Sequence, residues 1–275
     1  MKRFVHRMGP LGMVAVGILL LVVLGALSAP LIAPYDPTIG SVTQRYLGPS
    51  AAHLLGTDQA GRDIFSRLLW GARSSLIGPL IVVCVTAALG TLIALTSVWW
   101  GGAVDSLLSR LLDLLFAFPN LLLAMLAIAV FGPGLLTAAF ALAIAYIPYT
   151  ARVIRSTALR ERNLPYVRSP ELQGITGPTI AVRHLLPNVA PLIVTGATIN
   201  FGFAMIELAA LSFLGLGVQP PQADWGLMVA NGQQSLLKGY PAESILAGLC
   251  IVLTVASLGY VGDKLGGRAA AGRKA

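Results

Sequence analysis

The sequence predicts an all-α membrane protein with six transmembrane helices, and its composition and charge distribution support this. Of its 275 residues, 56% are hydrophobic and 11% are charged, whereas soluble domains contain about 25% charged residues. The mean hydropathy of +0.80 points the same way. The basic residues lie at the edges of apolar runs, so the net charge of +8 fits positive-inside topology, and no nucleic-acid partner is expected.

The lengths of the apolar runs place the spans. Residues 11–33 carry no charge and exceed the length of a signal-peptide core, which predicts an uncleaved first span. The charge-free run 114–151 would be about 57 Å long as one helix, so it must fold back near 131–134 into two spans. A short inner turn that includes Asp105 precedes this run. The six expected spans are 11–33, 76–98, the two halves of 114–151, 189–214 and 244–261.

The basic residues also predict the orientation of the chain. With the N- and C-termini cytoplasmic, 14 of the 19 Lys and Arg residues lie on the inner side and five lie on the outer side, as positive-inside topology requires. We divide the chain into an N-terminal anchor span with an external amphipathic segment (1–75), a core of five spans that includes the loop 151–188 (76–262) and a basic cytoplasmic tail (263–275).

The external segment contains one stretch with helical periodicity, residues 53–76. Thr57 or Asp58 is a suitable helix cap, and an apolar face develops from Asp63 onward, with Arg67 expected off that face. Asp58 and Asp63 are near enough to pair with some of the neighbouring arginines. Such a helix would lie at the outer membrane surface and lead into the second span. The alternative is a solvated lead-in without a specific role.

The longest polar segment between apolar runs is the loop 151–188, which contains six of the 19 basic residues and two acidic ones. A basic loop between spans stays in the cytoplasm, so it offers a surface to a cytoplasmic partner. A plain solvated connector is the alternative. Ser169-Pro170-Glu171 suits a helix start, and Gly174 suits its end. Gly177 predicts the start of a second short helix that stops before Pro187.

Three stretches carry a family resemblance. The first is LGTDQAGRDIFSRLLWGARSSL, residues 55–76, and the third is LSFLGLGVQPPQADWGLM, residues 211–228. The second lies in the loop, where Gly174 is followed by nine residues and then by HLLPN, 184–188, as in the EAA motif of the family. Together they resemble the permease subunits of bacterial binding-protein-dependent ABC importers, in the dipeptide, oligopeptide and nickel branch. The resemblance implies a type I ABC importer permease of MetI-like architecture in the bacterial inner membrane.

The resemblance also implies a role for the loop. In that family its short helix is a coupling helix that docks on a cytoplasmic ATPase. The docking residues expected in this sequence are Arg162, Tyr166, Arg168, Ser169, Pro170, Glu171, Leu172, Gly174 and Thr176. The sequence departs from the family at residues 168–170, where Arg-Ser-Pro replaces Glu-Ala-Ala and reverses the charge at the first position. An acidic groove on the partner would suit Arg168.

The implied partners are a homologous second permease subunit, two cytoplasmic ATPase subunits or domains, an extracytoplasmic solute-binding protein and the lipid bilayer. The sequence contains no GxxxxGK[ST] phosphate-binding loop. No cofactor is therefore expected on this chain, and ATP and Mg are expected on the partner ATPase. The HExxH pattern and other metal-ligand spacings are missing as well, so neither a metal nor catalytic residues are expected.

Two polar residues of the fifth span are candidates for a translocation pathway. Glu207 is the one acidic residue within this strongly apolar span, and intramembrane ionisable groups usually face a cavity, a bundle interior or a partner. An interfacial, structural role is the alternative. Asn200 lies two turns earlier on the same helix face.

The resemblance implies a permease subunit of an ATP-driven importer that forms half of the translocation pathway for di- or oligopeptides. Nickel, glutathione and other small solutes stay open as substrates, because recognition in such systems belongs largely to the external binding protein. Two other classes compete with an importer. An intramembrane enzyme would need paired catalytic groups beside Glu207, and a passive channel would not need a docking loop.

Overall fold

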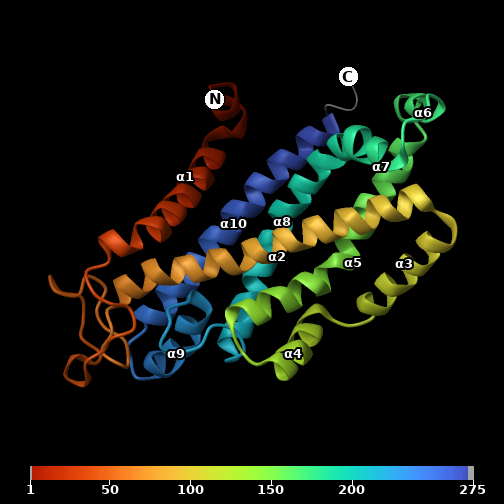
Figure 1. Cartoon of the computed structure of the whole chain (residues 1–275). Helices are drawn as coiled ribbons and strands as arrows, with labels where there is room; N and C mark the ends of the chain where they lie inside the picture. The colour runs from red at the N-terminus through yellow and green to blue at the C-terminus, as the bar shows by residue number, and fades with distance from the viewer. Residues whose placement is uncertain (1, 272–275) are drawn as a thin grey trace.

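The structure of the chain is a computed structural model that describes residues 2–271, with side chains from residue 9 to residue 264. The predicted basic tail, 263–275, extends past the described residues. The regular elements of the described chain are helices (Figure 1). They are α1 (Lys2–Ile32), the 3-10 turn η1 (Val42–Gln44), α2 (Ile64–Trp100), α3 (Gly102–Phe116), α4 (Asn120–Phe131), α5 (Leu135–Arg162), α6 (Pro165–Leu172), α7 (Gly177–Ile180), the π-turn η2 (Ala181–Leu185), α8 (Leu186–Phe213), α9 (Trp225–Leu237) and α10 (Ala242–Ala271).

Five helical segments of the described chain are long and apolar enough to cross a membrane. They are α1 from Gly9, α2, α5, the continuous α7–α8 segment and α10 up to Lys264. The helices α3 and α4 pass the same test only as a pair, and they are bent by 86° relative to each other. Pro119, which has no N–H, occupies the N-cap position of α4 at this bend. The first half of the run 114–151 is therefore not the separate span predicted from the sequence, because it is shared between the end of α3 and the 12-residue helix α4. The described chain has five spans, or six if the bent pair is one broken span.

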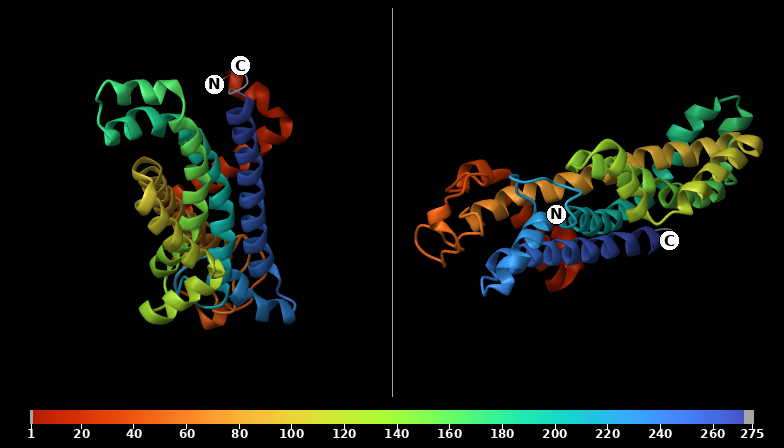
Figure 2. Two further views of the ribbon diagram at one scale, coloured as in Figure 1. Left: turned by 90° about the vertical axis from the view of Figure 1, so that its right-hand side faces the viewer. Right: turned by 90° about the horizontal axis from the view of Figure 1, so that it is seen from below.

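The long helices form one bundle. The helix α2 packs against α1, α5 and α8, and α10 packs against α1, α8 and α9. In Figures 1 and 2, α6, α7 and both described ends of the chain lie at one end of the bundle, while α9 and residues 33–63 lie at the other. The loop 151–188 and the chain ends thus share one side, as the topology predicted from the sequence requires.

Small residues allow α2 and α5 to approach each other closely. A Cβ atom added to Gly90 of α2 would lie 3.0 Å from Cγ2 of Thr150 in α5. Lipid chains are as apolar as leucine side chains, so helices in a membrane associate through such close packing rather than through the hydrophobic effect. The buried alanines of α5 are Ala138, Ala139, Ala141, Ala143, Ala145, Ala151 and Ala158.

The segment after α2 differs from the predicted short inner turn, because it contains the 15-residue helix α3. Positive φ angles at Gly101 (57°) and its neighbour (47°) reverse the chain first. Charges on α3 then hold it against α5. Nε of Arg155 donates a hydrogen bond to Asp105 (2.7 Å), and Arg152 forms an ion pair with Asp113. The polar residues predicted to form a turn therefore lie on the side of α3 that faces α5.

The predicted surface helix and the predicted second span are a single element, since α2 is continuous from Ile64 to Trp100. Asp63 caps it, in place of the predicted Thr57 or Asp58, by accepting a hydrogen bond from a first-turn N–H (2.8 Å). Arg67, predicted off the apolar face, is fully buried. The external segment folds over this end of α2 and covers the side that the helical pattern indicates as exposed.

The short helix predicted to stop before Pro187 continues instead into the fifth span. The helices α7 and α8 form one segment, 177–213. Between them η2 is a π-turn, in which the N–H of Leu186 donates to the carbonyl of Ala181, five residues earlier. Proline lacks a donor and its ring clashes with the carbonyl four residues before it in an α-helix, and a wider turn accommodates both effects.

Candidate functional site

The helix α6 at the tip of loop 151–188 is the predicted docking helix, but it starts earlier than predicted, at Pro165. Proline is favourable at the first helical position, where its missing N–H would have no partner. Ser169 therefore lies inside the helix rather than at its start. The predicted end at Gly174 is confirmed by a φ of +79°. Its N–H donates to the Glu171 carbonyl (3.1 Å), and the following N–H donates to that of Pro170 (3.1 Å), which is a Schellman-type ending.

One buried side chain fastens α6 to the bundle. Val167 is completely buried, and it is the buried residue of this helix. It packs in a cluster with Val98 of α2, Ile154 of α5, Ile180 of α7 and Leu185 of η2. The helix α6 is therefore anchored through Val167 in an apolar cluster to which α2, α5, α7 and η2 also contribute.

The outer side of α6 is exposed and partly apolar. Leu172 is 90% exposed, more than any other large hydrophobic residue in the described part of the chain. A hollow of about 530 Å³ lies beside it, lined by Leu159, Arg162, Asn163, Arg168, Glu171 and Leu172. This side of α6 is therefore not covered by any other element of the described chain, and it lies on a tip outside the apolar spans.

Polar contacts hold several of these side chains in place. The Tyr166 hydroxyl donates to Oε2 of Glu161 (2.7 Å), and Nη2 of Arg168 donates to Oδ1 of Asn163 (2.9 Å). The guanidinium group of Arg162 lies 5.0 Å from the ring centre of Trp99, at the end of α2. These contacts link the predicted docking residues Arg162, Tyr166 and Arg168 to the ends of α5 and α2.

The predicted docking residues fall into two groups. Arg162, Arg168, Glu171 and Leu172 line the hollow. Tyr166, Ser169 and Pro170 lie elsewhere on α6, Gly174 ends it, and Thr176 precedes α7, where its hydroxyl is 2.9 Å from that of Thr179. Leu159 and Asn163, at the end of α5, complete the hollow and are not among the predicted docking residues.

Glu207 and Asn200 line one cavity, as their spacing on α8 predicts. The cavity is open, has a volume of about 400 Å³ and lies where α4, α5 and α8 meet. The carboxyl group of Glu207 faces the Tyr146 hydroxyl and the Asn120 amide, and its Oε2 atom is buried without a hydrogen-bond partner. The complete lining is Phe116, Asn120, Ala145, Tyr146, Tyr149, Ile199, Asn200, Phe203 and Glu207.

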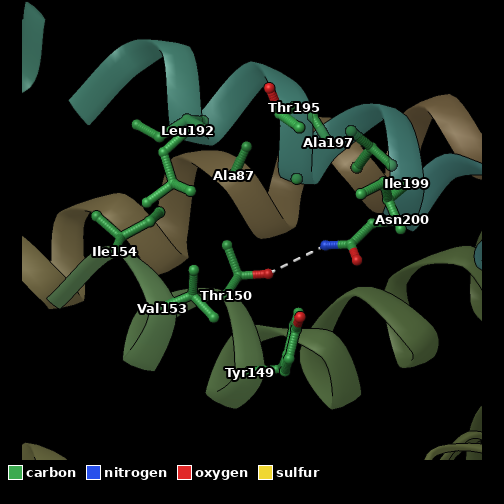
Figure 3. A pocket seen from close by; sticks show the side chains of 13 residues that line it. Ala87, Tyr149, Thr150, Val153, Ile154, Leu192, Thr195, Ala197, Ile199 and Asn200 are labelled. Carbon is green, nitrogen blue, oxygen red and sulfur yellow. Dashed lines mark hydrogen bonds between the residues drawn. The ribbon is translucent and has the colours of Figure 1, made fainter. Parts of the chain in front are cut away.

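Figure 3 shows how Asn200 joins α8 to α5 beside this cavity. Its Nδ2 atom donates a hydrogen bond to Oγ1 of Thr150 (3.3 Å). A smaller and mostly apolar cavity of about 150 Å³ adjoins this pair. Thr150 and Tyr146 were not predicted as partners of Asn200 and Glu207, although a separation of four residues places them on one face of α5. The missing information is which face of α5 turns toward α8.

A second polar cluster lies at the opposite end of the bundle from α6. We call it the external clamp and define it as Asp58, Arg62, Arg67 and Glu243. Asp58 is 2.7 Å from Nε of Arg62 and 3.5 Å from Nε of Arg67, which confirms that it pairs with neighbouring arginines. Nη1 of Arg67 also donates to the carbonyl of Pro37 (2.8 Å). Glu243, at the start of α10, is buried, and neither of its carboxyl oxygens has a hydrogen-bond partner.

Asp224 connects the loop before α9 to α2. It caps α9 by accepting a hydrogen bond from the N–H of Leu227 (3.2 Å), and it accepts another from the hydroxyl of Ser75 (2.7 Å). Burial raises the pKa of the Asp224 carboxyl above its ordinary value of 3.8, and these hydrogen bonds only partly oppose that effect.

A bundle of apolar helices, a seated helix protruding at one end and a polar cavity open between spans define the membrane-embedded subunit of a transporter. Residues 50–268 match the family model for the binding-protein-dependent transport system inner membrane component, and residues 2–49 match that for the N-terminal TM domain of oligopeptide transport permease C. The chain belongs to the binding-protein-dependent transport system inner membrane component family, the permease subunits of ABC importers. It is a multi-pass inner-membrane protein.

Relatives and a solved structure agree with this assignment. The chain is 40% identical over 261 residues to a putative peptide transport system permease protein of Brucella abortus (94% of this chain, 86% of the relative). It is 36% identical over 254 residues to the probable D,D-dipeptide transport system permease protein of Escherichia coli (92% and 85%). An inward-facing structure of the MetNI methionine ABC transporter matches with a TM-score of 0.58 and 20% identity (74% and 96%), which confirms the predicted MetI-like fold.

Proposed function

We propose that this chain forms half of the translocation pathway of an ATP-driven importer of di- or oligopeptides and couples to its ATPase through α6. The single observation that carries the coupling is the exposed Leu172 on a helix that is itself firmly seated. The peptide class is supported by the relatives, which are named as peptide and D,D-dipeptide permeases. Asn200 and Glu207 are the proposed pathway residues, because they line a cavity open between spans.

The contacts of α6 support a mechanical role. Its buried Val167 packs on α2, α5 and α7, and α7 continues without interruption into α8. A displacement of α6 by a closing ATPase would therefore move the ends of several spans together. Alternating access then follows from rigid-body rocking of this half of the permease against the other half.

The proposed assembly contains a homologous second permease, two cytoplasmic ATPase subunits or domains and an extracytoplasmic solute-binding protein. ATP and Mg would be bound by the ATPase, since this sequence has no phosphate-binding loop of its own. This chain would act as a transport subunit and not as an enzyme. Family membership supports a partner permease, an ATPase and a binding protein in general terms.

Reconstitution of the complete assembly in proteoliposomes tests the proposal. We expect the binding protein to stimulate ATP hydrolysis and labelled di- or oligopeptides to accumulate only with ATP present. Transport of Ni²⁺ or glutathione in place of peptides would contradict the substrate class. Transport without a bound ATPase, or assembly without one, would contradict the coupling.

Arg168 provides a sharper test of the docking surface. The residue is exposed and lines the hollow, so an acidic partner surface would be repelled by Arg168→Glu. We expect about tenfold weaker association with the ATPase, which corresponds to about 1.4 kcal/mol. Arg160→Glu is the matched control, because it makes the same charge change on an exposed residue outside the hollow. Equal effects of the two variants would refute a specific role for Arg168.

A further inference from the structure

We propose that the cavity around Glu207 is a subsite for an organic ammonium group, such as the free N-terminal amino group of a peptide. This inference rests on the proposed function and names the part of the substrate that the permease itself recognises. The cavity has room for such a group, with a volume of about 400 Å³, and it opens between α4, α5 and α8.

The charge balance of the cavity points to a cationic ligand. Glu207 is the charged residue of the lining, and none of the other lining residues is basic. Within the described residues Glu207 takes part in none of the five ion pairs. Its Oε2 atom is buried and has no hydrogen-bond partner. The Tyr146 hydroxyl and the Asn120 amide face this carboxyl group but carry no charge, so a cation placed against Oε2 would supply the missing opposite charge and a donor for that atom.

The remaining lining favours an organic ammonium over a metal ion. The rings of Phe116, Tyr146, Tyr149 and Phe203 border the cavity, and aromatic faces attract ammonium groups. Ni²⁺ prefers imidazole and other strongly donating ligands, usually several of them. The lining contains neither His nor Cys, and no group of three or more His, Cys, Asp and Glu side chains occurs among the described residues.

The position of the cavity makes it accessible from a pathway rather than from lipid. Tyr149 and Phe203 are 56% and 58% exposed, so this side of α5 and α8 is not covered within the chain. Asn120, Asn200 and Glu207 bring polar groups to the same surface, which would be unfavourable against hydrocarbon. A water-filled path shared with the second permease fits this mixture. A basic residue of that permease is the competing partner for Glu207.

The test measures binding to the permease–ATPase complex in nanodiscs without the binding protein. The two probes are tri-alanine and N-acetyl-tri-alanine, which differ in the charge at the amino end. We expect the complex to bind tri-alanine at least tenfold more tightly, and Glu207→Gln to abolish this preference. Asp113→Asn is the control, because it removes a carboxylate of α3 that lies outside the cavity lining, and it should keep the preference.

Asn120→Lys is the second variant and covers the case in which Glu207→Gln does not assemble. Asn120 is exposed at the start of α4, and a lysine there would place its own ammonium beside Glu207. Tri-alanine binding should then fall to the level of the acetylated probe. Equal binding of both probes to the wild type, an unchanged preference in either variant, or saturable Ni²⁺ binding that Glu207→Gln removes would overturn the subsite.

These results are separable from those on the proposed function. Absence of the amino-group preference in the wild type, with intact ATP-driven uptake, would refute only the subsite and leave the importer function unaffected. Absence of binding-protein-stimulated ATP hydrolysis would refute the importer whatever the titrations show. Glu207 could pair instead with a basic residue of the second permease. In that case the wild type would bind both probes equally, and Glu207→Gln would weaken the association of the two permeases. This pair of results would count against the subsite.

Discussion

Replacing Val167 with alanine should detach α6 without changing its exposed surface. This helix has eight residues, and helices so short are not stable alone in water, so α6 depends on the packing of Val167. The substitution removes two buried carbons at about 0.8 kcal/mol each, and the cavity left behind adds to this. The resulting loss of about 1.5–2.5 kcal/mol corresponds to a roughly 10- to 70-fold larger population of detached α6.

Hydrogen exchange of the purified permease in nanodiscs measures this population directly. Amides of residues 164–175 should exchange faster in Val167→Ala by the same factor, and ATP hydrolysis stimulated by the binding protein should decrease. Leu172→Ala is the matched control. It removes an exposed side chain, so exchange in the permease alone should stay unchanged while association with the ATPase weakens. If the amides of residues 164–175 exchanged as slowly in Val167→Ala as in the wild type, the anchoring role of Val167 would be refuted.

Three further predictions concern buried contacts. Arg67→Met should lower the free energy of unfolding by about 1–3 kcal/mol, because the carbonyls of Pro37 and Pro221 lose their donor while Asp58 keeps Arg62. An unchanged thermal midpoint would contradict this. Asp224 holds its proton more tightly when folded, so wild-type stability should decrease as the pH rises from about 3.8 through the raised pKa of Asp224. Asp224→Asn should lack this decrease in stability. Identical profiles of stability against pH for the wild type and Asp224→Asn would refute the role of Asp224. Gly177→Ala should destabilise the docking end by about 1–3 kcal/mol, since its methyl group would overlap the indole of Trp99. An unchanged thermal midpoint together with altered tryptophan fluorescence would show instead that the ring moves aside without cost.

Five of the spans were predictable because each depends on one segment alone, whereas the bend between α3 and α4 was not predicted. A run such as 11–33 is long and uncharged whatever surrounds it, and its length decides whether it can cross the bilayer. The end of α6 at Gly174 was predictable for a similar reason, since a left-handed C-cap favours glycine locally. The predicted start of α6 was wrong because Ser169-Pro170-Glu171 has the residue types of an N-cap and a first turn, whereas the helix begins one turn earlier at Pro165.

Features that depend on distant segments were not predictable. Arg67 lies on a side of α2 that the helical pattern indicates as exposed, and it is buried only because residues 33–63 and the loop before α9 fold over it. The same holds for Tyr146, whose role in the cavity depends on how α5 faces α8. Glu207 and Asn200 were accessible to sequence reasoning because both lie on one helix, and a polar residue in an apolar run is informative by itself.

The continuity of α2 has a mechanical consequence for the whole molecule. Its first turns are held in the external clamp by Arg67, and its last residues touch Arg162 of the docking surface through Trp99. A helix of 37 residues is about 56 Å long, so tilting it by about 5° would shift one end by about 5 Å relative to the other. The helix α2 can therefore transmit a movement from the end of the bundle that carries α6 to the opposite end. No loop between the two ends would have to rearrange.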